Sequence, residues 1–158
     1  MGSINNLCQY SKLREENWFG RFYGMQQFNL HRYPKFSHRH WQLCFFCDGL
    51  TKAEFANIEH LCSINFSDYT SNPLYNAKHL YINGEEIKDL VIPNSVTKIG
   101  ENAFIGCDVL TSATIPNSVT EIGGGAFERC SNLTSVSIPN SVTKIGDRTF
   151  IIYILQVL

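Results

Sequence analysis

The chain has 158 residues, of which 44% are hydrophobic, and this is long enough for one packed domain. Its 13 Lys and Arg residues against 14 Asp and Glu residues give a net charge of −1, which argues against nucleic acid as a partner. No segment reaches the about 20 apolar residues of a transmembrane helix, and residues 1–25 lack the apolar core of a signal peptide, so we expect no membrane insertion.

Residues 1–46 contain no repeat but many aromatic side chains, too many for ordinary disorder. We expect an irregular segment that either caps the structure following it or does not settle, and both alternatives stay open. The aromatic residues are Trp18, Phe19, Phe22, Tyr23, Phe28, Tyr33, Phe36 and Trp41.

Four zinc-type ligands occur close together at the end of this segment: His38, His40, Cys44 and Cys47. Their spacing resembles no common zinc finger, and Cys47 also has a place in the repeat pattern described below. We therefore expect no cofactor, and keep a small zinc-binding segment at residues 31–47 as an alternative hypothesis.

Residues 47–86 predict an irregular unit of short elements. Leu50–Phe55 has the alternation of a strand, and Ile58–Ile64 fits a short helix. Leu80–Ile82 followed by Asn83 and Gly84 is a strong hairpin signal, because both residues tolerate positive φ. We interpret this unit as a degenerate repeat that ends in a hairpin.

Residues 87–158 carry three tandem copies of one phrase. Ile92-Pro-Asn-Ser-Val-Thr-Lys-Ile-Gly100 recurs from Ile115 to Gly123 and from Ile138 to Gly146, each 23 residues after the last. A fixed period of this size is typical of a solenoid, in which one unit cannot bury its apolar face alone and stacks on its neighbours. The product is an extended surface, which favours binding over chemistry.

Each 23-residue coil is expected to be a strand, a turn at proline, a second short strand ending at glycine, and a helical or 3₁₀ turn that places Phe in the core. Lys98, Glu121 and Lys144 would alternate in charge across neighbouring coils. The positions expected to point inward are Leu110, Ala113, Ile115, Val119, Ile122, Ala126, Phe127 and Cys130, followed one period later by Leu133, Val136, Ile138, Val142, Ile145, Thr149 and Phe150.

The phrase I-P-x-x-V-T-x-I-G-x-x-A-F-x-x-C-x-x-L resembles the BspA-like leucine-rich repeat family over about residues 47–150. The resemblance implies an α+β repeat solenoid, with 23-residue coils of short strands plus a helical turn. It also implies cell-surface or secreted microbial proteins that bind host proteins or other cells, although no signal peptide is present in this chain. The leading hypothesis is a non-enzymatic binding or adhesion module for protein or glycan surfaces.

The pattern fails after Phe150, where the chain ends in Ile-Ile-Tyr-Ile-Leu-Gln-Val-Leu158. A repeat array normally finishes with a polar cap, so this apolar tail predicts an uncapped C-terminal end. A truncated or rearranged fragment without independent function is therefore a second alternative.

Catalytic patterns are weak throughout the chain. Cys107 and Cys130 occupy equivalent positions of adjacent coils and are expected to be buried thiols rather than nucleophiles or a disulfide. Gly123-Gly-Gly125 aligns with Gly100-Glu-Asn102, so we interpret it as a bend of the repeat and not as a phosphate loop. We expect no enzyme activity.

The predicted binding surface is the outer face of the first strands, formed by the residues between the inward ones. Short hydroxyl side chains make this face flat and lose little entropy on contact. The same composition also suits any exposed strand, so a purely structural role stays open. The residues are Lys88, Asp89, Val91, Thr111, Ser112, Thr114, Thr134, Ser135 and Ser137.

Overall fold

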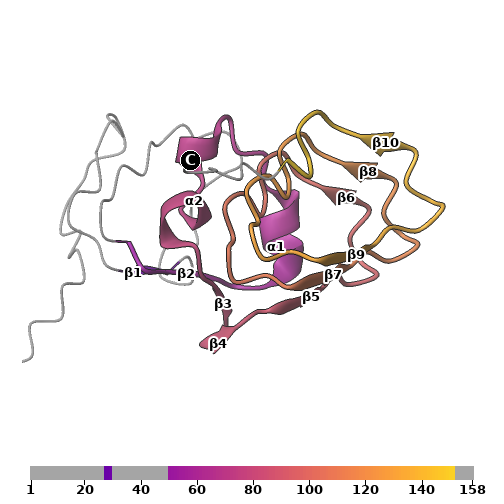
Figure 1. The fold of residues 1–158 in the computed structure, drawn as a ribbon. Coiled ribbons are helices and arrows are strands. Elements are labelled where there is room, and N and C mark those ends of the chain that lie inside the picture. The colour runs from indigo at the N-terminus through magenta and orange to yellow at the C-terminus, as the bar shows by residue number, and fades with distance from the viewer. Residues whose placement is uncertain (1–26, 30–49, 152–158) are drawn as a thin grey trace, which may run out of the picture.

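The computed structural model describes residues 27–29 and 50–151 (Figure 1). The aromatic segment, apart from the backbone of strand β1 (Gln27–Asn29), lies outside these ranges. The four zinc candidates His38, His40, Cys44 and Cys47 lie outside them as well, as does the tail beyond Ile151.

The irregular unit contains the strand, the short helix and the hairpin that its sequence predicts, together with two further short helices that it does not. Strand β2 (Lys52–Phe55) is followed by helix α1 (Ile58–Ser63), the short 3₁₀ helix η2 (Tyr69–Ser71), helix α2 (Leu74–Ala77), β3 (Leu80–Ile82) and β4 (Glu85–Glu86). These strands form one sheet in the order β1-β2-β3-β4, in which β3 and β4 are the antiparallel pair. Asn83 and Gly84 have φ of 52° and 82°, as the tight hairpin requires.

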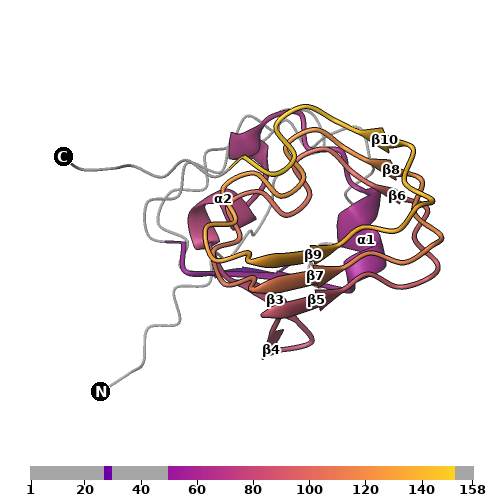
Figure 2. The same ribbon diagram turned by 45° about the vertical axis from the view of Figure 1, so that its right-hand side comes forward.

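The three regular coils stack through two parallel sheets, which confirms the repeat fold (Figures 1 and 2). The main sheet joins β5 (Asp89–Val91), β7 (Ser112–Thr114) and β9 (Ser135–Ser137). The second joins β6 (Lys98–Ile99), β8 (Glu121–Ile122) and β10 (Lys144–Ile145). Asp89 pairs with Ser112 and Ile99 with Ile122, so each coil meets the next in a register of one 23-residue period.

A single core runs through the irregular unit and the first two coils. All eight inward positions predicted for the middle coil are buried, and Phe127 stacks between Phe104 and Phe150 with ring centroids 5.2 and 5.6 Å away. In the last coil the prediction of burial is wrong for Ile138, Ile145 and Phe150, which are 41%, 48% and 37% exposed. Among the described residues no later coil covers their outer side.

The predicted helical or 3₁₀ turn is present in part: the segment after each glycine is a run of turns, in which the N–H groups of Ile105 and Cys107 donate to carbonyls three residues earlier at 3.3 and 3.2 Å. The N–H groups of Asn102, Phe104 and Gly106 donate to the carbonyls of Gly124, Ala126 and Glu128 in the next coil, at 3.0, 2.8 and 2.7 Å. Donors that point to the next coil cannot close a helix. This arrangement requires positive φ at the equivalent residues Asn102, Gly125 and Arg148, which explains the last glycine of Gly123–Gly125.

Candidate binding surface

The nine residues predicted as a binding surface lie together on the outer side of the main sheet. Eight of them are exposed and Ser112 is half-buried, whereas Leu90 and Ala113 between them point into the core. Strands β5, β7 and β9 run side by side in both views (Figures 1 and 2). The outer side chains therefore form rows that cross from one coil to the next.

The first row contains Lys88, Thr111 and Thr134 and is held by the backbone. The Thr111 N–H donates to the Lys88 carbonyl at 2.8 Å, and the Thr134 N–H donates to the Thr111 carbonyl at 3.0 Å. Both threonine hydroxyls donate to the same carbonyls at 3.3 Å. The side chains of this row are thus fixed at the edge of the face.

The second row contains Asp89, Ser112 and Ser135, and Asp89 is its only ionised group. Oδ1 of Asp89 accepts from the Ser112 hydroxyl at 2.6 Å and from the Thr111 hydroxyl at 3.0 Å. These hydrogen bonds, that from Ser112 first, lower the pKa of the Asp89 carboxyl. The group is therefore a charged and oriented acceptor on an otherwise neutral row.

The third row contains Val91, Thr114 and Ser137 in register. Val91 is 65% exposed, the highest value among the exposed large hydrophobic side chains of the described residues. The row thus changes from apolar at β5 to hydroxyl at β7 and β9.

A cluster around Glu86 extends this face beyond β5, and its residues are not among the predicted ones. Glu86 pairs with Nδ1 of His79 at 2.6 Å and with Nζ of Lys88 at 3.9 Å. The hydrogen bond to His79 is the main reason that the pKa of the Glu86 carboxyl is lowered. Burial, and then Glu86, raise the pKa of Tyr81, whose ring lies 4.2 Å from Nζ of Lys52. Extending the outward alternation into β2 and β3 would have found these residues.

The second sheet carries the predicted alternation of charge. Oε1 of Glu121 lies 3.3 Å from Nζ of Lys98 and 2.7 Å from Nζ of Lys144. The hydrogen bond from Lys144, followed by that from Lys98, lowers the pKa of Glu121. The same contact raises the pKa of Lys144. Ion pairing thus links all three coils on this side.

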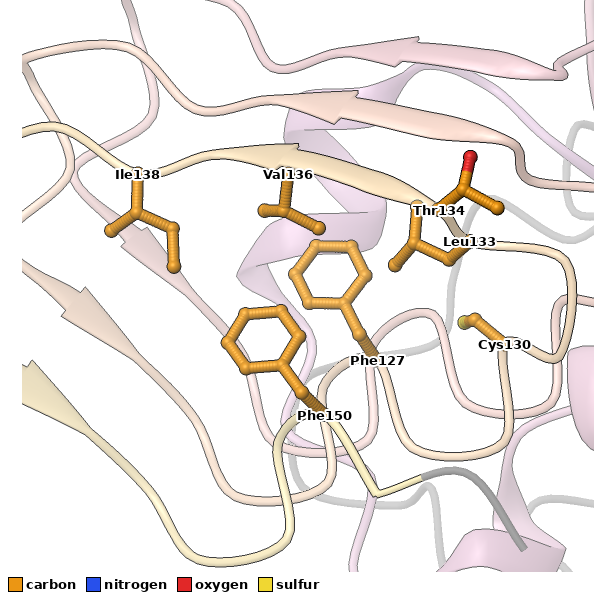
Figure 3. Close-up of a pocket in the computed structure, with 7 residues that line it drawn as sticks. All are labelled: Phe127, Cys130, Leu133, Thr134, Val136, Ile138 and Phe150. Carbon is orange, nitrogen blue, oxygen red and sulfur yellow. The ribbon is translucent and has the colours of Figure 1, made fainter. Parts of the chain in front are cut away.

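The last coil leaves a cavity of about 230 Å³ at its outer side (Figure 3). Its walls are nearly all apolar and contain neither an acid nor a base, so they offer no catalytic group. The lining residues are Phe127, Cys130, Leu133, Thr134, Val136, Ile138 and Phe150.

The thiols in the described part of the chain are free and buried. Burial raises the pKa of Cys62 and of Cys130 to about 12, and raises that of Cys107 well above its ordinary value. Such thiols are protonated and inert at neutral pH. Within residues 50–151 no three His, Cys, Asp or Glu side chains come together as metal ligands.

The repeat register and the two parallel sheets agree with a comparison of the sequence with known families. The family model of the BspA type leucine rich repeat region, which comprises six copies, matches residues 76–156, more than half of the chain. The chain belongs to this family. Among the described residues, this BspA-type chain has no helix that is both long and apolar enough to cross a membrane.

One solved structure is similar to this BspA-type chain: a leucine-rich repeat protein from Bacteroides ovatus, 44% identical, with a TM-score of 0.36. The match covers 39% of this chain and 18% of that protein. The chain therefore spans less than a fifth of that relative. No curated protein matches.

Proposed function

We propose that this BspA-type chain is a non-enzymatic binding or adhesion module, and that its coils stack as a leucine-rich-repeat solenoid. The outer face of the main sheet would contact a protein or glycan surface. The observation that carries this proposal is the alignment of the predicted side chains in three rows across the coils, two along strands β5, β7 and β9 and one just before them. Mostly short side chains held by the backbone lose little entropy on contact.

The proposal is tested by placing a bulky charge on the face. Thr114→Arg and Ser137→Arg each put a long cation among exposed short side chains. Thr97→Arg is the matched control, because Thr97 is exposed next to β6 in the second sheet. Binding of the full chain to a panel of purified extracellular proteins and to a glycan array is measured for each variant.

The two main-sheet variants should weaken binding by about tenfold or more, which corresponds to about 1.4 kcal/mol, whereas Thr97→Arg should leave it unchanged. Binding that survives both Thr114→Arg and Ser137→Arg would assign the contact to another face. Thermal unfolding gives a separate check: a chain without a cooperative transition would favour the alternative of a fragment without independent function.

A further inference from the structure

We infer that Asp89 and Val91 are the anchor of the main-sheet face, and that they bind a protein segment presenting a Lys or Arg side chain beside an aliphatic one. This inference rests on the proposed function, because it names the partner chemistry for the same face.

Among the described residues, no cation pairs with Asp89, the carboxylate of this face. Two other carboxylates, on strands β2 and β4, are paired, Glu54 with Lys52 at 3.6 Å and Glu86 with His79 and Lys88. Asp89 instead accepts from two neutral hydroxyls, both at Oδ1. Hydroxyls orient a carboxylate without neutralising it, so its charge remains available for a charge-assisted hydrogen bond to an ammonium or guanidinium group.

Val91 supplies an apolar contact beside this charge. Residues two apart on a strand point to the same side, so Asp89 and Val91 lie about 7 Å from each other along β5. The equivalent side chains in the next coils, Thr114 and Ser137, are polar, so the apolar position is specific to β5. A large hydrophobic side chain that is 65% exposed gains free energy when a partner covers it.

The β3–β4 hairpin comes just before β5 in the chain and projects from the molecule (Figures 1 and 2). The contacts of Glu86 with His79, Lys88 and Tyr81 hold its side chains before any partner arrives. Groups that are already ordered lose less entropy on binding. The charge of the described region also suits a basic partner, because residues 50–151 contain 11 Asp and Glu residues against seven Lys and Arg residues.

The test uses an array of synthetic peptides with the core X-Ser-Z in Gly/Ser flanks, where X and Z each run through the amino acids. The labelled full chain is applied at low ionic strength, because exposed charge contacts are screened by salt. We expect selection of Lys or Arg at one varied position and of Leu, Ile or Val at the other. Selection of acidic residues, or no selection at either position, would overturn the inference.

Two variants separate the contributions. Asp89→Asn keeps the Oδ1 acceptor for Ser112 and Thr111 and removes only the charge, so the preference for Lys or Arg should fall at least tenfold while the aliphatic preference remains. Val91→Thr should reduce the aliphatic preference at least tenfold while the preference for Lys or Arg remains. Asp147→Asn, an exposed carboxylate of the last coil, is the matched control and should change neither preference.

Failure of the inference is distinguishable from failure of the proposed function. If Thr114→Arg abolishes binding to a protein from the panel while Asp89→Asn and Val91→Thr leave that binding unchanged, the face binds and the anchor is wrong. If all three variants leave it unchanged, the face itself is wrong.

Discussion

The side-chain amide of Asn72 donates from Nδ2 to the carbonyl of Asn102 at 2.7 Å and to that of Ala103 at 3.0 Å. Asn72 is fully buried, and its Oδ1 accepts from the N–H of Leu74 at 2.9 Å. One side chain thus connects the irregular unit to the first regular coil. It supplies a donor to the buried carbonyl of Ala103 and a second donor to the carbonyl of Asn102, which also accepts from the Ile105 N–H.

Asn72→Asp should be strongly destabilising. The carboxylate keeps the acceptor for Leu74 but loses both donations and faces two carbonyl oxygens in a buried position. The loss should be at least about 2 kcal/mol in the free energy of unfolding, measured by urea denaturation. The exposed Asn94→Asp is the control, and an equal effect of both variants would contradict this role for Asn72.

Replacing a phenylalanine of the stack by Ala should reduce stability more where the ring is more deeply buried. Phe127 is 1% exposed between two rings, whereas Phe150 is 37% exposed with one ring beside it. Phe127→Ala should therefore cost about 3–5 kcal/mol, and Phe150→Ala clearly less. Denaturation midpoints of the two variants check the order, and a larger loss for Phe150→Ala would contradict the stacking.

Gly123→Ala should destabilise the stack because two coils approach closely there. A Cβ at Gly123 would lie 2.6 Å from the backbone nitrogen of Glu101, whereas one at Gly124 would lie 3.2 Å from the nearest atom, the carbonyl oxygen of Asp147. Overpacking of this kind costs about 1–3 kcal/mol. Thermal unfolding should show a lower Tm for Gly123→Ala than for Gly124→Ala. Equal Tm values of the two variants would indicate that the coils move apart at Gly123 without loss of stability.

Ion pairing of Glu121 should contribute stability in a defined pH window. Its folded pKa is lowered, so the contribution is complete above the unfolded value of about 4.3 and is lost as the pH falls through the folded value. Tm measured against pH should show the wild type above Glu121→Gln at pH 7 and the two converging below pH 4. Glu121→Lys, which aligns three like charges, should be the least stable at pH 7 and should recover most with added salt.

Buried cysteines should resist modification in the folded chain. In a variant with Cys8, Cys44 and Cys47 replaced by Ser, the remaining three thiols are those whose burial raises the pKa. A thiol reagent at pH 8 should titrate none of them until denaturant is added, and then all three. Rapid native reaction of Cys130 would show that the end of the stack opens readily.

The period of the sequence was sufficient to predict the stacking of the coils and the interior of the middle one. Leu110 through Cys130 have a coil on either side, so a repeated apolar position there is a buried position. The same rule failed at Ile138 and Ile145, because burial depends on a neighbour that the pattern of one coil cannot supply. The pattern also did not predict that the N–H groups of Asn102 and Phe104 in the turns donate to the next coil.

The candidate surface was predicted in part. The rows of the regular coils follow from strand alternation, and the structure brings Lys88, Thr111 and Thr134 together as expected. The contacts of His79, Tyr81 and Glu86 depend on how the hairpin sits beside the sheet, and no repeat in the sequence encodes that position. The ionic partners that distinguish Glu86 from Asp89 were therefore visible only in three dimensions.

Alternate amides of the turn segments point the same way along the stack, from Asn102, Phe104 and Gly106 toward the second coil and from Gly125, Phe127 and Arg129 toward the third. That side of the molecule consequently has a direction. Each coil offers N–H donors to the coil that follows it and carbonyl acceptors to the coil that precedes it. A duplicated coil inserted in the middle would meet acceptors ahead and donors behind, so such an array can be lengthened internally without redesign of either neighbour.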